Sequence, residues 1–287
     1  MNSFLTPQLE ARLKKTQFVT RTRLVSGQQG NRRATGFGRS LDFSDYRSYH
    51  YGDDLRQIDW NVYARTNKHY IKRFLDEKEM QVAIYIDCSK SMRLDPLKWL
   101  KVQQVTSFLA LIGFANGDRM SVLPIQAKTS PFLQKKGAGY YPVLNHYLHT
   151  LMDFNHEAFF KNLIKVKQHR ASLHVFLTDT FEETDDIIES IQQFQSKDRL
   201  IILQVMTKDE IEPTIRGDKK VIDSETDSHV NVTIQKKTIN SYVDRLNEHI
   251  ERLRYFCQKR GISIVQMDVD APLESLFVQL KQEQIIM

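Results

Sequence analysis

The feature that most constrains the fold is a regular alternation of short apolar runs and helical segments from Met80 onward. The runs expected to form strands cover residues 81–86, 119–125, 129–133, 173–177, 200–206 and 262–267. Helical periodicity covers residues 95–116, 141–152, 156–166, 185–194, 238–259 and 272–281. Parallel strands need crossover helices and are buried on both faces. The pattern therefore predicts an α/β fold with a doubly wound, mostly parallel sheet.

The chain divides into two regions that differ in how their apolar, aromatic and charged residues are arranged. Residues 80–287 are expected to form the α/β domain, with a polar β-hairpin excursion near residues 209–233. Residues 1–79 are expected to form a β-rich N-terminal extension that packs on this core. It contains a short helix, a basic loop with repeated Gly and Arg, and an irregular but ordered segment of aromatic and charged residues at 42–66.

Composition limits the classes of function. The 41 Lys and Arg residues exceed the 35 Asp and Glu residues by a modest margin, which does not by itself make a nucleic-acid binder. The two cysteines, Cys88 and Cys257, are predicted to be separate thiols in a reducing compartment. The longest apolar run, residues 108–115, is too short to cross a bilayer. We therefore expect a soluble, cytoplasmic protein without a membrane segment.

Polar side chains follow two of the apolar runs where the expected strands end. Asp87, Ser89 and Ser91 follow residues 81–86, and Asp179 lies just beyond residues 173–177. Ligands of doubly wound sheets bind at the carboxyl ends of strands, where the strand order reverses. Oxygen ligands from these side chains suit hard cations such as Mg²⁺. The spacing fits equally well an interpretation in which Asp87 and Ser89 only cap the following turn.

The same residues carry a family resemblance. Asp87-x-Ser89-x-Ser91 behind an apolar strand, with Asp179 at the end of a later strand, resembles the metal-ion-dependent adhesion site of von Willebrand factor A domains. The upstream sequence GFGRSLDFSDYRSYHYGDDLRQIDWNVYARTNKHYIKRF, residues 36–74, closely resembles the bacterial family called domain of unknown function 58.

Later residues extend this resemblance over residues 27–280: the sequence DSET at 223–226, the long helix that contains Tyr242, and Gly261 before the last strand. The resemblance implies a von Willebrand factor A-like protein that works with a MoxR-type AAA+ ATPase, or its client, in chaperone-like maturation or metal insertion. It implies no established catalysis. The sequence names neither the partner nor the oligomeric state.

On this basis we expect a non-enzymatic adaptor whose cation docks an acidic side chain of a partner protein. Asp87, Ser89, Ser91 and Asp179 would hold the ion, which would be Mg²⁺, Mn²⁺ or Ca²⁺. Full adhesion sites add a loop threonine, and the stretch that we match to this loop, residues 135–140, contains neither Thr nor Ser. We therefore expect the ion site to be incomplete or weak.

A second set of residues forms a possible partner surface in the N-terminal extension. Its members carry charges or an aromatic ring: Arg39, Asp45, Arg47, Asp53, Asp54, Arg56, Asp59, Trp60 and Arg65. The arginines supply forked donors and the aspartates supply matching acceptors. Internal ion pairs and turns account for the same residues, and we favour that interpretation.

Two other functions compete with the adaptor. A strand-terminal aspartate near Mg²⁺ could be the nucleophile of a phosphoryl-transfer enzyme, which makes Asp87 the candidate. That chemistry predicts a second carboxylate two residues later, where the sequence has Ser89. Arginines 21–39 could bind nucleic acid, but no nucleic-acid motif accompanies them, so we expect a solvated basic loop.

Overall fold

The structure is a computed structural model of residues 1–287. It describes residues 3–19, 34–37, 43–76, 80–151, 158–168, 170–194, 198–215, 217–222 and 229–287. The chain forms two compact units: Met1–Val19 with Met80–Met287, and Thr20–Glu79. The basic loop predicted at residues 20–40 falls mostly outside the described residues, as do residues 223–226.

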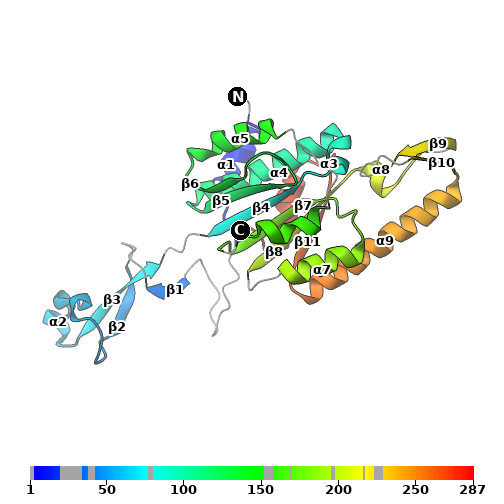
Figure 1. The fold of residues 1–287 in the computed structure, drawn as a ribbon. Helices are drawn as coiled ribbons and strands as arrows, with labels where there is room; N and C mark the ends of the chain where they lie inside the picture. Colours follow the sequence, from blue (N-terminus) through cyan, green and yellow to red (C-terminus); the bar gives the residue numbers. More distant parts are fainter. Residues whose placement is uncertain are drawn as a thin grey trace. The chain divides into compact units, whose positions relative to one another are not determined.

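A six-stranded sheet forms the centre of the larger unit (Figure 1). Its strands are β4 (Gln81–Asp87), β5 (Arg119–Ile125), β6 (Phe132–Lys136), β7 (Leu173–Thr178), β8 (Arg199–Met206) and β11 (Ser263–Asp268). They lie in the order β11-β8-β7-β4-β5-β6, and all pairs are parallel except β5 with β6. Numbered along the chain, this is the order 3-2-1-4-5-6 of doubly wound folds, which confirms the predicted fold class.

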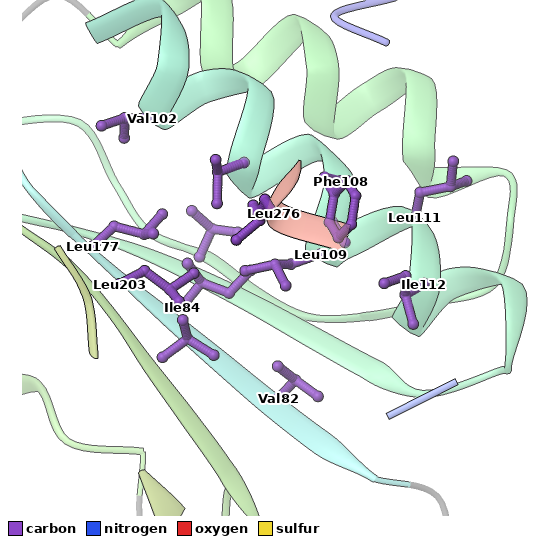
Figure 2. Close-up of a cluster of buried hydrophobic side chains, with 14 of the residues drawn as sticks. Val82, Ile84, Val102, Phe108, Leu109, Leu111, Ile112, Leu177, Leu203 and Leu276 are labelled. Atoms are coloured by element: carbon purple, nitrogen blue, oxygen red, sulfur yellow. The ribbon is translucent and has the colours of Figure 1, made fainter. Parts of the chain in front are cut away.

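Two hydrophobic cores lie on opposite faces of this sheet, because neighbouring residues of a strand point to opposite sides. In β4, Ile84 belongs to one core and Tyr85 to the other. Figure 2 shows part of the first core, where Ile84 of β4 lies between Leu203 and Leu109. Both faces are therefore covered, as the continuous apolar strands predict.

Helices cover the two faces in separate layers (Figure 1). On the first face lie α1 (Pro7–Leu13), α4 (Pro96–Ala115), α5 (Tyr140–Thr150) and α10 (Leu273–Gln282). On the second face lie α6 (Phe159–Leu163), α7 (Thr184–Phe194) and α9 (Lys236–Lys259), with the 3-10 turn η2 (Ile164–Val166) after α6. None of the helices in the described part of the chain combines the length and apolarity needed to cross a membrane.

Helix α4 is the longest helix of the first face, and its ends follow from local sequence. Asp95 caps its start, since the Asp95 side chain accepts a hydrogen bond from the Leu97 amide at 2.7 Å, and Pro96 occupies the first helical position. The helix stops before Gly117, whose φ of +71° favours glycine. Gly113 lies inside the helix, where a Cβ atom would meet the Met120 sulfur at 2.1 Å.

The polar stretch after β8 contains a helical turn and the expected hairpin. Helix α8 (Lys208–Ile211) comes first, followed by the antiparallel pair β9 (Gly217–Ile222) and β10 (His229–Ile234). The sequence pattern did not predict α8. A capping box forms it: Glu210 and the capping residue Thr207 each bind the backbone amide of the other through their side chains.

The first nineteen residues differ from the predicted extension, because they belong to the larger unit. Leu9, Leu13 and Phe18 are buried in the first core, and the backbone of residues 17–19 pairs with residues 285–287. How Thr20–Glu79 packs on the domain stays a prediction.

The smaller unit is more regular than the irregular segment predicted at residues 42–66. It contains β1 (Ala34–Phe37), β2 (Phe43–Ser48), η1 (Leu55–Gln57), α2 (Trp60–Thr66) and β3 (Tyr70–Asp76). The three strands form an antiparallel sheet in the order β1-β3-β2. Short caps explain the regularity: Asp54 caps η1, and Asp59 caps α2 through the amides of Asn61 and Val62.

Candidate functional site

The carboxyl end of β4 places Asp87 in a tight polar turn. The Asp87 side chain is 2% exposed, and its Oδ1 atom accepts a hydrogen bond from the Ser89 amide at 2.9 Å. Its Oδ2 atom accepts one from Thr178 Oγ1 at 2.7 Å, which ties β4 to the adjacent strand β7. Ser89 immediately precedes α3 (Lys90–Leu94) as its N-cap residue. The Ser89 and Ser91 hydroxyl oxygens lie 3.0 Å apart. The predicted convergence of Asp87, Ser89 and Ser91 is therefore compatible with the local geometry.

The end of β7 presents Asp179 beside Asp87, at the point where the strand order reverses. Asp179 Oδ1 accepts a hydrogen bond from the Phe181 amide at 3.2 Å. The next residue, Thr180, has a φ of +60°, which is strained for a β-branched residue. Gln204 holds its hydroxyl at 2.7 Å, and a ring nitrogen of His249 lies 2.8 Å from its carbonyl oxygen. These contacts fix the loop that carries Asp179.

Burial and like charge shape the electrostatics of the site. Burial and, to a lesser extent, the nearby charge of Asp179 together raise the pKa of Asp87 to about 7, against the hydrogen bonds from Thr178 and Ser89 that lower it. Burial also raises the pKa of the Cys88 thiol, so Cys88 is an inert thiol beside the site. A positive charge next to Asp87 would stabilise the ionised pair of carboxylates.

One cation of the chain already lies at Asp179. Lys98 of α4 is fully buried, and its Nζ atom lies 2.9 Å from Asp179 Oδ2 and 2.7 Å from Glu210 Oε1. Burial alone would lower the pKa of Lys98, but the charges of Asp179 and Glu210 outweigh it and raise this pKa above its usual value. Lys98 is therefore a buried ammonium shared by two carboxylates.

The donor set fits a hard divalent cation in its chemistry. Asp87, Ser89, Ser91 and Asp179 offer only oxygen atoms, from two carboxylates and two hydroxyls, and Mg²⁺ accepts one or two carboxylates while it keeps several waters. Within the part of the chain that the structure describes, no group of three or more His, Cys, Asp and Glu residues could hold a metal ion. A cation at this position would therefore depend on the serine hydroxyls.

Comparison with known proteins assigns the chain to a family. Residues 45–253 match the family described as protein of unknown function DUF58, and this range covers most of the chain. The chain belongs to the DUF58 family. The resemblance to this family that residues 36–74 carry is thus confirmed.

Curated relatives of this DUF58 protein match over part of its length. The uncharacterized protein Mb1516 of Mycobacterium bovis and the uncharacterized protein Rv1480 of Mycobacterium tuberculosis are each 26% identical to it over 120 residues. These alignments cover 41% of this chain and 38% of each relative. The chain therefore matches well under half the length of these relatives.

Solved structures with a similar fold have low sequence identity. A von Willebrand factor type A protein from Catenulispora acidiphila is 12% identical, with a TM-score of 0.40 over 75% of this chain and 43% of its own. BatB from Bacteroides thetaiotaomicron is 12% identical, with a TM-score of 0.38 over 71% and 98% of the two chains. An aerotolerance-related membrane protein from Bacteroides fragilis is 16% identical, with a TM-score of 0.36 over the same shares.

The loop that we matched to the adhesion-site threonine was wrongly placed for this DUF58 protein. Strand β6 runs antiparallel to β5, so that Lys136 lies opposite Arg119, at the start of β5. Asp87 lies opposite Ile125, at the other end of β5. Residues 135–140 therefore lie at the amino end of β5, whereas Asp87 lies level with its carboxyl end. Their lack of Thr or Ser says nothing about the ion site.

Three residues of the predicted partner surface make contacts within the smaller unit. Arg47 and Asp53 form a two-pronged ion pair at 2.8 and 2.9 Å, and this pair with the His50 amide lowers the pKa of Asp53 to about 2. Asp59 is buried and accepts the Tyr46 hydroxyl at 2.9 Å in addition to capping α2. These contacts agree with the favoured interpretation of internal ion pairs and turns.

The other members of the predicted partner surface are exposed or lie outside the described residues. Arg56 and Arg65 are exposed, and so is Trp60, at 57%. Asp54 is exposed and caps η1. Arg39 and the side chain of Asp45 lie outside the described residues.

Sequence reasoning missed Lys98 and Glu210. Together with Asp87 and Asp179 they form a charge cluster in this DUF58 protein. A signal for Lys98 was present, because it shares a helical face with Val102, Val105 and Leu109, all of which are buried. A lysine in line with buried residues needs a carboxylate partner. The sequence pattern offered no comparable signal for Glu210, since the turn of helix that carries it was not predicted.

Proposed function

We propose that this DUF58 protein is a non-enzymatic interaction adaptor that holds a divalent cation at Asp87, Ser89, Ser91 and Asp179. The observation that carries the proposal is the cluster of oxygen donors from the ends of β4 and β7, at the reversal of strand order. Asp87 has no lysine or arginine partner among the described ion pairs, and burial with the charge of Asp179 raises its pKa to about 7.

The residues of the site have distinct tasks in this proposal. Asp87 supplies a carboxylate whose orientation is fixed by the Ser89 amide and the Thr178 hydroxyl. Ser89 and Ser91 supply neutral hydroxyl oxygens, of which Ser89 is buried and Ser91 is partly exposed. Bound there, the cation would supply positive charge and an open coordination position for a carboxylate of the partner.

Exposed apolar side chains near this position support a protein partner. Leu94 at the end of α3 is 71% exposed, and Leu97 in the first turn of α4 is 56% exposed. Phe181, two residues after Asp179, is 41% exposed, and its ring centroid lies 5.4 Å from Lys98 Nζ. Exposed apolar side chains that lie close to polar residues are typical of protein interaction sites. The expected partner segment has an acidic residue flanked by apolar ones.

The partner class that we propose rests on the family resemblance. We propose that a MoxR-type AAA+ ATPase, or its client, docks at this site during chaperone-like maturation or metal insertion, and that this takes place in the cytoplasm. Support comes from the match of residues 45–253 to DUF58 and from the resemblance in residues 36–74.

The two competing functions gain no support from the described residues. Phosphoryl transfer by Asp87 predicts a second carboxylate two residues later, and that position is Ser89, whose hydroxyl lies beside that of Ser91. Most of the basic stretch at 21–39, on which nucleic-acid binding would depend, lies outside the described residues.

The test is capture of a purified MoxR-type ATPase from the same organism by the immobilised chain, with Mg²⁺ or with EDTA. The variants are Asp87→Asn and Leu97→Asp. Matched controls are Asp268→Asn, at the end of β11 on the same sheet edge, and Leu133→Asp, an exposed leucine on β6. We expect EDTA, Asp87→Asn and Leu97→Asp each to reduce capture about tenfold or more, with both controls unchanged. Equal capture in all conditions would remove the site from partner binding.

A further inference from the structure

Lys98 occupies a position that its own helix and two loops fix. Its side chain is fully buried, and its ammonium contacts Asp179 Oδ2 at 2.9 Å and Glu210 Oε1 at 2.7 Å. An ammonium without partners in such a place would be strongly destabilised, so Lys98 cannot leave both carboxylates at once. Its charge therefore always lies beside the proposed cation site.

Glu210 is held in place by contacts of its own. Its Oε2 atom accepts a hydrogen bond from the Thr207 amide at 2.7 Å, and its own amide donates to Thr207 Oγ1 at 3.2 Å. The Tyr242 hydroxyl of α9 donates to the Glu210 carbonyl at 2.8 Å. One carboxylate oxygen of Glu210 is thus committed to the capping box, and the other remains for Lys98.

Asp179 is the one residue that Lys98 and a divalent cation would share. Its Oδ1 atom accepts from the Phe181 amide and its Oδ2 atom from Lys98, so its negative charge is already partly neutralised. A divalent cation at Asp87 and Asp179 must share this carboxylate with an ammonium of the same sign. In a buried site, such repulsion is only weakly screened.

We propose that Lys98 sets the cation affinity of the site by competing with the ion for Asp179, and that Glu210 moderates this competition by sharing the ammonium. The inference rests on the proposed cation site. It makes the affinity a property of helix α8 as well as of the two strand ends. Any rearrangement of α8 or of Tyr242 that moves Glu210 away from Lys98 weakens cation binding.

The test is titration of the full chain with Mn²⁺ at about pH 8, followed by electron paramagnetic resonance of the free ion. Four variants are compared with the wild type: Lys98→Met, Glu210→Gln, Lys101→Met and Asp87→Asn. Lys101 is the matched control, since it lies one turn further along α4 and its ammonium binds the Ala271 carbonyl at 2.5 Å rather than a carboxylate of the site. Circular dichroism confirms that each variant is folded.

We expect Lys98→Met to tighten Mn²⁺ binding about tenfold or more and Glu210→Gln to weaken it about threefold or more, while Lys101→Met changes it less than about twofold. Unchanged affinity in both Lys98→Met and Glu210→Gln would overturn the inference, and so would equal effects of Lys98→Met and Lys101→Met. If Lys98→Met does not fold, Glu210→Gln decides alone. Wild-type binding that Asp87→Asn leaves unaltered, or no binding at all, would instead overturn the proposed function.

Discussion

Replacing Lys98 by methionine should destabilise the larger unit even without any metal ion. The substitution leaves Asp179 and Glu210 without their shared ammonium while it preserves most of the side-chain volume. Removing one partner of a buried ion pair costs about 3–5 kcal/mol. Asp179 is buried but the Glu210 side chain is 25% exposed, so we expect the lower end of that range, about 3 kcal/mol.

The assay is urea unfolding in EDTA in a Trp60→Phe background, so that fluorescence reports Trp99 of α4 alone among the two tryptophans of the chain. The control Lys101→Met removes one hydrogen bond to a carbonyl and should cost about 1–2 kcal/mol. In a double-mutant cycle, Lys98→Met with Asp179→Asn should recover about 1–3 kcal/mol relative to the sum of the single changes. A loss below about 1 kcal/mol for Lys98→Met, or strict additivity in the cycle, would refute the reasoning.

Three further predictions concern residues outside the charge cluster. Burial lowers the pKa of His174 from 6.5 to about 4. The stability that the neutral ring contributes is therefore complete above pH 6.5 and declines towards pH 4. Between pH 7.5 and pH 5, the free energy of unfolding measured in urea should fall by about 2 kcal/mol more for the wild type than for His174→Asn. Parallel pH profiles of the two proteins would contradict this. Gly113→Ala should destabilise by about 1–3 kcal/mol despite its better helix propensity, because the new Cβ meets the sulfur of Met120; a higher unfolding midpoint would contradict the clash. Asp59→Ala should lower the stability of helix α2 by about 1–2 kcal/mol, which is measured as faster hydrogen exchange of the α2 amides. Unchanged protection of these amides would show that the cap is dispensable.

The central fold could be predicted from the sequence because its strands are continuous apolar runs separated by capped helices. The predicted run 81–86 and the helix 95–116 agree with β4 and α4 within one residue at each end. The smaller unit could not be predicted in this way, since charges and aromatic residues are mixed there without a clear period. Its order depends on specific side-chain contacts, such as Arg47 with Asp53 and Asp59 with Tyr46.

The candidate site was predictable as far as it depends on strand ends. Asp87 and Asp179 follow two apolar runs, and adjacent parallel strands bring such ends together. The contact of Lys98 with Glu210 joins residues 112 positions apart through a helical turn that no pattern indicated. The mismatch of residues 135–140 has a similar cause, because the reversal of β6 moves that loop to the far edge of the sheet.

Crystals of the chain grown with Mn²⁺ test the central claim most directly, through the anomalous difference map of the bound ion. Our account predicts one strong peak bounded by the Asp87 and Asp179 carboxylates and the Ser89 and Ser91 hydroxyls, and loss of that peak in Asp87→Asn. A peak elsewhere at saturating Mn²⁺, or none at this position while Lys98 remains paired with Asp179, would contradict the account.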